Sequence, residues 1–388
     1  MRLLIISHTP HYQNRGQVFG WGSTVHEIDQ LATLFDQIVH LAPLYTGPPP
    51  GSSLPYEAPN IKLRFVSPAG SNSLWDKLSI LTQIPRWLSA MKTEMQAADA
   101  LHVRCPAGIS LVGLIAARFW ARDKPIWVKY AGNWESYKGQ ALSYKFQRWF
   151  VNNNHHKGVV TINGKWKGQP EYVLTFHNPS FSEIELTKAR EKSKDKNLTY
   201  PLQLLFVGRL SRSKGVHRVL QIAKRLHERG VNYQLTLVGD GPERPKFTAF
   251  VKQQGLGNEI RFTGWQPMNT LGKYYEAAHF LIFPSSSEGW PKVLSEAMAY
   301  GVVPLASSIA SIPQILEETK AGLAISPDNI QGYINAIMQY TQIATTWNQA
   351  SQNGQKAAAQ FTYEHYLSEI RILFNQFWQI NLTHGKNA

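Results

Sequence analysis

The stretch LLFVGRLSRSKG, residues 204–215, decides the fold class of this chain. Four consecutive apolar residues, 204–207, predict a buried strand, and the spacing of apolar residues over 216–229 predicts an amphipathic helix. Gly230 suits the position that follows the end of a helix. A strand, a glycine-containing loop and a helix in this order are typical of an α/β protein with a parallel sheet.

The same alternation extends outward in both directions. Toward the C-terminus we expect strands at residues 235–238, 259–263, 280–283 and 302–306, and helices that include 330–341 and 364–379. Toward the N-terminus we expect strands at 2–6, 38–41, 61–66, 100–103, 126–130 and 158–162, and helices near 24–35, 76–97, 108–121 and 141–152. The segment between the first strand and the first helix is expected to be a glycine-containing loop.

A charged segment, TKAREKSKDKNL at residues 187–198, is nearly free of apolar side chains and is the best linker candidate. We therefore expect two α/β domains joined by a linker and followed by a C-terminal helix, with the boundaries 1–186, 187–200, 201–363 and 364–388. In open α/β sheets, ligands bind beyond the carboxyl ends of the strands. Strand-end loops of both domains are therefore expected to line one shared cleft.

Composition excludes several classes of protein. A hydrophobic content of 43% and an aromatic content of 12% exclude a mainly disordered chain. The one cysteine, Cys105, cannot form an internal disulfide or a cysteine-based zinc site, and it fits a reducing compartment. The longest apolar stretch, 107–120, contains Arg118 and is too short to span a bilayer. We therefore expect a soluble or membrane-surface protein.

The formal net charge of +14 is unevenly distributed. Residues 62–167 contain 16 Lys and Arg against 5 Asp and Glu, and they also carry tryptophans at positions 75, 87, 120, 127, 134 and 149. Basic residues mixed with aromatic ones suit an anionic bilayer surface, and they would also suit single-stranded nucleic acid. A solvated face without a partner is the third interpretation.

Two segments carry residues suited to a phosphorylated, hydroxyl-rich ligand. Arg209 and Lys214 bring two cations to one strand end near a helix start, which suits a diphosphate, although a loop with solvated cations is the alternative. In PSSSEGWPKVLSE, residues 284–296, Glu288 precedes a helix and Glu296 lies on its second turn. Carboxylates accept hydrogen bonds from sugar hydroxyls. The alternative interpretation is that Glu288 stabilises the helix dipole and that Glu296 is a surface residue.

The segment SSSEGWPKVLSEAMAYG resembles the signature of retaining glycosyltransferases of family 4. LLFVGRLSRSKGV resembles their phosphate-binding strand and loop, and LTLVGDGPER, IRFTGW and IPQILEETKAGLAI match neighbouring segments in order and spacing. The resemblance is strong over about residues 202–340 and weaker over 1–180. It implies an α/β protein with the GT-B fold, in which two Rossmann-like parallel-sheet domains face a central cleft. The N-terminal domain would bind the acceptor, the C-terminal one the donor, and the last helix would cross back to the N-terminal domain.

The resemblance also implies roles for individual residues. Arg209 and Lys214 would hold the donor diphosphate and stabilise its charge as it leaves, and Glu288 would contact hydroxyls of the transferred sugar. Glu296 would bind the ribose, and Trp265 lies where the family passes near the nucleobase, although core packing also explains a tryptophan there. The other donor contacts it implies are Gly20, Gly208, Gly289, Trp290, Pro291, Lys292 and Val293.

The N-terminal half departs from the family pattern. Phe19 stands where relatives carry the first of two loop glycines, and Ala131 occupies the usual position of a histidine. The polar role of that histidine would pass to Lys129 or Asn133, unless this subgroup works without it. His102 lies where many relatives carry the first histidine of a His-x-His pair, and it is a further candidate on the acceptor side.

The resemblance implies a retaining glycosyltransferase (hexosyl or N-acetylhexosaminyl) with front-face attack. It would use a nucleotide-diphosphate sugar, with UDP favoured over GDP, and a glycan or polyprenyl-diphosphate-linked acceptor in polysaccharide or glycolipid biosynthesis. No Asp-x-Asp motif is present, so we expect no metal and no cofactor. We expect a cytoplasmic protein, peripheral at the inner face of the membrane.

Two alternatives stay open at this point. The first is another GT-B enzyme that acts on sugar nucleotides, such as an epimerase. The second is a non-enzymatic, basic nucleic-acid-binding protein, which would leave the spaced acidic pair and the phosphate loop unexplained. For that reason no nucleic-acid partner is expected.

Overall fold

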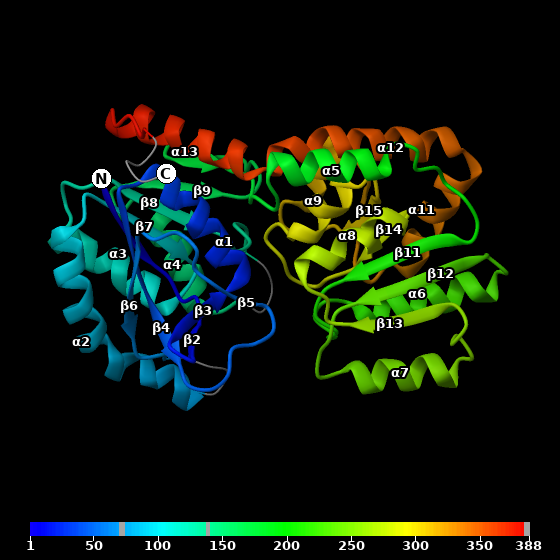
Figure 1. The fold of residues 1–388 in the computed structure, drawn as a ribbon, viewed down its shortest axis with the longest axis horizontal. Coiled ribbons are helices and arrows are strands. Elements are labelled where there is room, and N and C mark those ends of the chain that lie inside the picture. The colour runs from blue at the N-terminus through cyan, green and yellow to red at the C-terminus, as the bar shows by residue number, and fades with distance from the viewer. Residues whose placement is uncertain (70–73, 137–139, 384–388) are drawn as a thin grey trace. The chain divides into compact units, whose positions relative to one another are not determined.

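The computed structural model describes residues 1–69, 74–136 and 140–383 (Figure 1). The chain forms two compact units. Unit 1 comprises Met1–Phe176 and Leu367–Ala388, and unit 2 comprises His177–Tyr366. Each unit is an α/β domain with its own sheet and its own hydrophobic core.

The sheet of unit 1 is parallel except at one edge. Its strands are β1 (Arg2–Ile6), β2 (His11–Asn14), β3 (Gln17–Trp21), β4 (Gln37–Tyr45), β5 (Ser53–Pro55), β6 (Ile61–Val66), β7 (Ala100–Cys105), β8 (Ile126–Tyr130), β9 (Val159–Ile162) and β10 (Val173–Thr175). They are arranged in the order β10-β9-β8-β7-β1-β4-β2-β3-β5, with β6 also paired to β4. The side chains of β7 alternate in direction, so Leu101 and Val103 enter the core whereas His102 and Arg104 lie on the opposite face.

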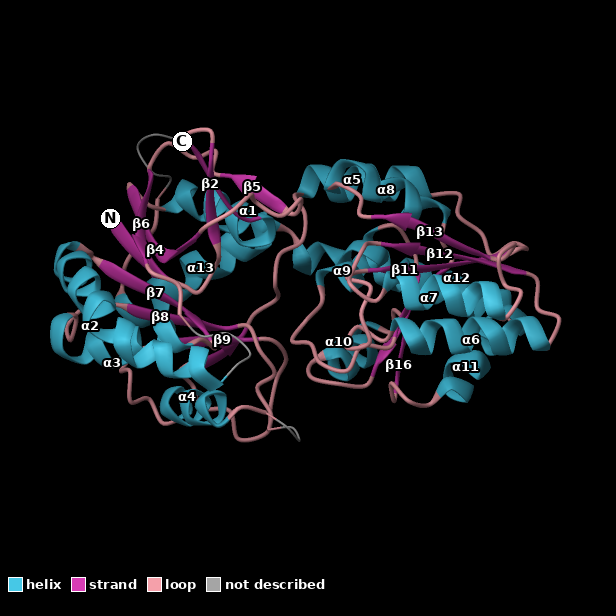
Figure 2. Ribbon diagram, turned by 90° about the horizontal axis from the view of Figure 1, so that it is seen from below, coloured by secondary structure: helices cyan, strands magenta, loops and turns pink. Residues whose placement is uncertain are grey.

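The helices of unit 1 are α1 (Gly22–Leu31), α2 (Leu74–Ala97), α3 (Gly108–Trp120) and α4 (Leu142–Asn152), and most of α13 (Tyr363–Trp378) also belongs to this unit. Figure 2 shows α2 and α3 along one side of the sheet. Phe374 of α13 packs edge-on against Phe35 and Trp127, with ring centroids 5.7 and 6.5 Å apart. Of the expected C-terminal segment 364–388, residues 384–388 lie outside the described part of the chain.

The segment between β1 and α1, which was expected to be a loop, contains the antiparallel hairpin of β2 and β3. Arg15 and Gly16 at its tip both have positive φ, 49° and 81°, as the tight turn of a two-residue hairpin requires. The sequence HYQN of β2 is short and polar, and Gly20 interrupts the apolar residues of β3, so neither strand shows the apolar alternation on which strand recognition depends.

Unit 2 contains a sheet of six parallel strands. They are β11 (Leu202–Val207), β12 (Tyr233–Val238), β13 (Ile260–Gly264), β14 (Phe280–Phe283), β15 (Val303–Ser307) and β16 (Leu323–Ile325), in the order β13-β12-β11-β14-β15-β16. The helices are α5 (Glu183–Ser193), α6 (Val216–Glu228), α7 (Arg244–Gln253), α8 (Met268–Ala277), α9 (Lys292–Ala299), α10 (Ile312–Thr319), α11 (Ile330–Gln342) and α12 (Ala344–Ala357). The strand–loop–helix unit predicted from residues 204–215 is β11 and α6.

Of the linker expected over 187–200, residues 187–193 form the second part of α5, and the whole segment lies within unit 2. Ser182 and Glu185 form a reciprocal capping box that satisfies backbone groups at the helix start. Only Leu186, Ala189 and Ser193 of this helix are buried. A buried stripe this small is hard to recognise in a charged sequence.

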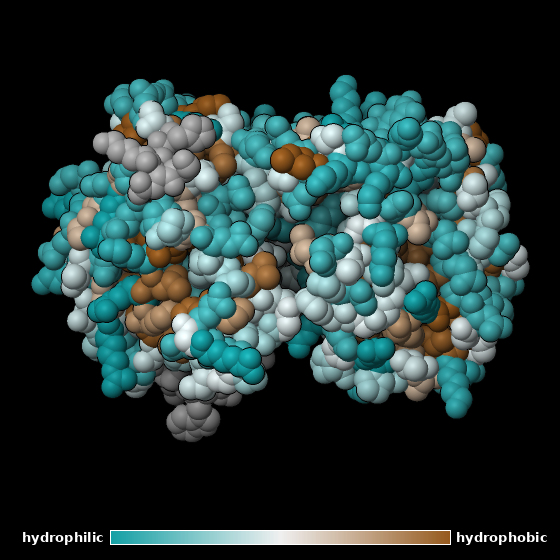
Figure 3. Space-filling view, viewed as in Figure 1, coloured by the Kyte–Doolittle hydropathy of each residue, from teal (hydrophilic) through white to brown (hydrophobic). Residues whose placement is uncertain are grey.

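On the face drawn in Figure 3, apolar side chains form separate small groups among hydrophilic ones.

Candidate functional site

Two loops meet at the carboxyl edge of the sheet of unit 2. The strands β11 and β14 are parallel neighbours, so the loops that follow them, 208–215 and 284–291, begin side by side. The backbone N–H of Ser286 donates to the carbonyl of Ser213 at 2.9 Å. Gly215 has a φ of +80°, and a Cβ atom there would lie 2.0 Å from the carbonyl oxygen of Pro284. Only glycine permits this contact between the two loops.

This contact brings Lys214 and Glu288 together. The Lys214 Nζ atom lies 2.6 Å from Oε1 of Glu288, although the residues are 74 positions apart in the chain. The Ser285 hydroxyl has one proton and donates it to the same carboxylate oxygen at 2.6 Å. Glu288 is 10% exposed and Lys214 is 34% exposed. The ion pair therefore lies at the surface where the two loops meet, and the Lys214 side chain is the partner more exposed to water.

The other cation of the β11 loop is Arg209, which is exposed and directly follows Gly208. Trp265 follows the end of β13 and is 49% exposed, so core packing does not explain this tryptophan. Both residues lie at the carboxyl edge of the same sheet, where ligands of open α/β sheets bind.

The helix α9 starts at the end of the β14 loop. Its N-cap is Pro291, and no side chain caps the helix start. The Leu294 N–H donates to the Pro291 carbonyl at 3.0 Å, which leaves the N–H groups of Lys292 and Val293 for an oxygen ligand. Trp290 is buried and stacks on Phe361 with ring centroids 5.1 Å apart, so only its backbone can serve a ligand. The Gly289 carbonyl accepts a hydrogen bond from Ser311 at 3.1 Å. The Lys292 ammonium lies 3.4 Å from the Tyr363 hydroxyl, and Val293 is half-buried.

Glu296 lies one helical turn further along α9 and faces α8. Its carboxylate accepts a hydrogen bond from the Tyr275 hydroxyl at 2.7 Å. Burial raises the pKa of Glu296, against the opposing effects of the Tyr275 hydrogen bond and the charge of Lys292. The structure thus places the two acids against different partners, Glu288 on Lys214 and Glu296 on Tyr275.

In unit 1, Gly20 lies in β3 and packs closely against its neighbours. A Cβ atom there would lie 2.8 Å from Val25 and 3.0 Å from the His11 ring. Asn133 accepts a hydrogen bond from the backbone N–H of Glu135 at 3.0 Å, as in an Asx turn. The structure therefore shows local packing and turn roles for both residues.

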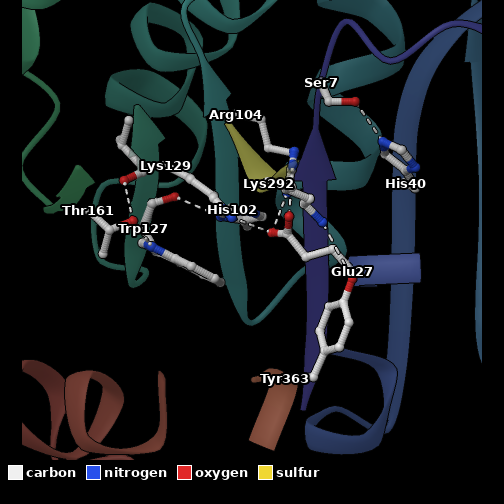
Figure 4. Close-up of polar contacts among 11 residues, drawn as sticks. Ser7, Glu27, His40, His102, Arg104, Trp127, Lys129, Thr161, Lys292 and Tyr363 are labelled. Carbon is white, nitrogen blue, oxygen red and sulfur yellow. Dashed lines mark hydrogen bonds and ion pairs between the residues drawn. The ribbon is translucent and has the colours of Figure 1, made fainter. Parts of the chain in front are cut away.

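Lys129 belongs to a buried ionic triad that the sequence did not reveal. Its Nζ atom lies 2.7 Å from Oε1 of Glu27, and Arg104 binds both oxygens of the same carboxylate at 2.7 and 3.2 Å. Figure 4 shows Glu27, from α1, against Arg104 of β7 and Lys129 of β8. Such a bidentate geometry holds the guanidinium firmly. Lys129 therefore stabilises the carboxyl edge of this sheet through Glu27.

His102 lies next to this triad and is fully buried. Its ring stacks on Trp127 with centroids 3.8 Å apart, and its Nδ1 atom donates to the Trp127 carbonyl at 3.3 Å. Burial and the charge of Arg104 hold the pKa of His102 well below its usual value. His102 is thus a neutral, packed side chain of the sheet, and its Nε2 atom has no protein partner among the described residues.

A second buried network also escaped sequence reasoning. The His11 Nδ1 atom lies 2.9 Å from the Thr9 carbonyl, so it carries the proton, and burial lowers the pKa of His11 to about 4. The Tyr56 hydroxyl then donates to His11 at 2.8 Å and accepts from Nδ1 of His40 at 2.8 Å. The Ser7 hydroxyl donates to His40 at 2.7 Å and accepts from the Thr9 N–H at 3.1 Å. The donors and acceptors close into a ring that fastens the start of the β2–β3 hairpin to β4.

The described residues contain neither a metal cluster nor a membrane-spanning helix. Within residues 1–69, 74–136 and 140–383, no group of three or more His, Cys, Asp or Glu side chains is placed to hold a metal ion. No helix in the same ranges combines the length and the apolar character that crossing a membrane requires.

Solved structures share the fold of the whole chain. Sucrose-phosphate synthase from Thermosynechococcus elongatus is similar with a TM-score of 0.71 and 17% sequence identity, over 97% of this chain and 99% of that one. HepE of Anabaena in complex with UDP is similar with a TM-score of 0.67 and 16% identity, over 97% and 100% of the two chains. At this level of identity the likeness shows the fold alone. That fold is GT-B, with two Rossmann-like parallel-sheet domains.

Sequence comparison adds a family match in unit 2. Residues 188–357 match the model of the family described as Glycosyl transferases group 1, and this segment contains both loops of the candidate site. The amylovoran biosynthesis glycosyltransferase AmsK of Erwinia amylovora is 26% identical over 165 residues, which are 41% of this chain and 40% of that protein. The first curated relatives are matched over 37% to 42% of their own lengths.

Proposed function

We propose that this chain is a glycosyltransferase that moves a sugar from a nucleotide-diphosphate donor to a glycan or lipid-linked acceptor. One observation carries the proposal: the Lys214 ammonium and the Glu288 carboxylate meet at 2.6 Å where two strand-end loops join. The ammonium group is suited to binding a diphosphate, and the carboxylate is suited to accepting hydrogen bonds from sugar hydroxyls. The group 1 family match over the same loops supports this assignment.

The reaction would break the bond between the anomeric carbon and the diphosphate. Lys214 and Arg209 would stabilise the negative charge that develops on the leaving group, together with the uncapped N–H groups at the start of α9. When the sugar binds, Glu288 would accept hydrogen bonds from its hydroxyls and release Lys214 to the phosphates. Glu296 would bind the ribose. Fixed cations and amides suffice for this role, so the proposed reaction needs no metal and no cofactor.

The finer assignments form part of the same proposal. The resemblance to family 4 supports retention of the anomeric configuration through front-face attack, in which the acceptor oxygen bonds to the anomeric carbon and its proton passes to the departing phosphate. UDP is the favoured nucleotide, because it is bound in the similar HepE structure. A role in polysaccharide assembly is supported by the match to an amylovoran enzyme. The transferred group would be a hexosyl or N-acetylhexosaminyl unit, and the acceptor would be a glycan or a polyprenyl-diphosphate lipid reached from the cytoplasm.

A panel of nucleotide sugars tests the proposal without an acceptor. We expect one donor to raise the melting temperature and to be hydrolysed slowly to the nucleoside diphosphate and the free sugar. Glu288→Ala should abolish this hydrolysis in a protein that still folds. A sugar nucleotide that returns epimerised, with no free sugar, would instead identify an epimerase. Binding of oligonucleotides but of no nucleotide sugar would overturn the proposal.

A further inference from the structure

One stripe of large apolar side chains on α4 faces water. Leu142 is 80% exposed, Phe146 is 45% exposed and Trp149 is 52% exposed. Their spacing of four and three residues places them on one side of the helix. The buried residues of this helix are Gln147, Phe150 and Val151. The helix thus leaves its largest apolar stripe in water.

The end of α3 carries two further exposed apolar side chains. Phe119 is 74% exposed and Ile115, one turn earlier, is 41% exposed. Arg118 on the same helix donates to the carbonyl of His155 at 2.8 Å, and the His155 ring lies 4.7 Å from the Trp149 ring. These contacts link the C-terminal ends of the two helices through His155. We call the five exposed side chains, Ile115, Phe119, Leu142, Phe146 and Trp149, the α3–α4 surface.

The charges around the α3–α4 surface have one predominant sign. Neither α3 nor α4 contains an aspartate or a glutamate. Arg118 and Lys145 lie within the two stripes and are exposed, and Arg122 and Lys157 extend the basic rim. Asp123 is the acid that follows Arg122 in the chain. Aromatic and aliphatic side chains among exposed cations suit the boundary between the headgroups and the acyl chains of an anionic bilayer.

We propose that the α3–α4 surface docks this protein onto a membrane that contains anionic lipid. The cations would approach lipid phosphates, while Phe146, Trp149 and Phe119 would enter the headgroup–acyl boundary. A second copy of the chain is a poorer occupant, because a two-fold contact would place the same cations against each other. The inference rests on the proposed function in one respect: docking would bring a lipid-linked acceptor to unit 1.

Vesicle sedimentation at low salt tests this proposal. The probes are vesicles of phosphatidylglycerol with phosphatidylcholine, and vesicles of phosphatidylcholine alone. We expect the protein to sediment with the first kind and much less with the second. The double variant Phe146→Glu/Trp149→Glu should lower the partition coefficient at least about tenfold, because it removes apolar contacts and adds two charges that anionic lipid repels.

A matched control separates this surface from the general effect of net charge. Ile184 and Ile372 are also exposed, at 66% and 54%, but lie on α5 and α13. The variant Ile184→Glu/Ile372→Glu carries the same charge change and should sediment like the wild type. Equal losses in both variants, or no sedimentation of the wild type, would overturn the proposal. The proposal would also be overturned if the wild type formed a dimer in the absence of lipid and the Phe146→Glu/Trp149→Glu variant were monomeric.

Donor hydrolysis in the absence of vesicles distinguishes the two proposals. Both double variants should hydrolyse the donor at the wild-type rate, since all four substituted side chains face water and none belongs to the loops of the donor site. If no nucleotide sugar is hydrolysed but the vesicles still bind, the proposed transfer reaction fails and the docking surface stands. If hydrolysis is normal and the variants sediment like the wild type, the docking surface fails alone.

Discussion

Replacement of Lys214 by methionine tests whether the loops after β11 and β14 form one donor site. Methionine keeps a long unbranched apolar side chain and removes the ammonium group. The change therefore deletes the 2.6 Å ion pair with Glu288 and little of the packing. Ser285 still donates to the Glu288 carboxylate, so the acid keeps a hydrogen-bond donor in the variant.

The expected effects on stability and on catalysis differ in size. Lys214 is 34% exposed, so water screens the pair, and the free energy of unfolding should fall by at most about 1 kcal/mol. A hydrogen bond to a charged group contributes about 1.5–3 kcal/mol when it is made to the departing diphosphate. That range corresponds to a fall in kcat of roughly 10- to 150-fold. A large kinetic loss with a small loss of stability is the pattern of a ligand contact.

The assay is donor hydrolysis with the nucleotide sugar that the panel identifies, measured as kcat and KM, together with urea unfolding. Lys214→Arg keeps the positive charge and should recover part of the lost rate. In the double variant Lys214→Met/Glu288→Gln, the loss of kcat, expressed as a free energy, should be smaller than the sum of the losses in the two single variants, because both groups act on one bound donor. A folded Lys214→Met protein whose kcat stays within about twofold of the wild type would show that Lys214 is a surface cation.

Three further outcomes are expected. Gly215→Ala places a Cβ atom 2.0 Å from a carbonyl of the β14 loop, so KM for the donor should rise and the melting temperature should fall, and an unchanged KM would contradict the account of the loop junction. Glu27→Gln removes the carboxylate that Arg104 and Lys129 share, so urea unfolding should show a loss of about 3 kcal/mol or more, and a loss below about 1 kcal/mol would argue against a buried triad. Burial lowers the pKa of His11 to about 4, so as the pH falls the imidazole is protonated in the unfolded chain before it is protonated in the folded one. The free energy of unfolding should therefore fall as the pH drops from about 6.5 to about 4. His11→Gln removes this titration and should show a shallower fall in the same unfolding series.

The sequence alone predicted the elements that local patterns specify. Runs such as 204–207 and 280–283 form buried parallel strands, and the loops that follow them carry Lys214 and Glu288. Parallel strands end at one edge, so the strand pattern places both loops at the same edge of the sheet, whereas the pairing of β11 with β14 that brings them together is a tertiary contact. The charged segment 187–193 was misjudged because propensity and capping form a helix there with very little buried apolar surface.

Only the tertiary structure decided which polar side chains share a site in unit 1. Glu27 and Lys129 are 102 positions apart, and they meet because α1 lies over the strands that carry Arg104 and Lys129. The order of strands in a sheet, the choice of the helix that covers each face and the rotation of α4, which leaves Trp149 in water, depend on contacts between distant segments. A single sequence read for local periodicity contains no signal for such contacts. The loops of the proposed donor site could therefore be predicted from the sequence, whereas the buried networks and the α3–α4 surface could not.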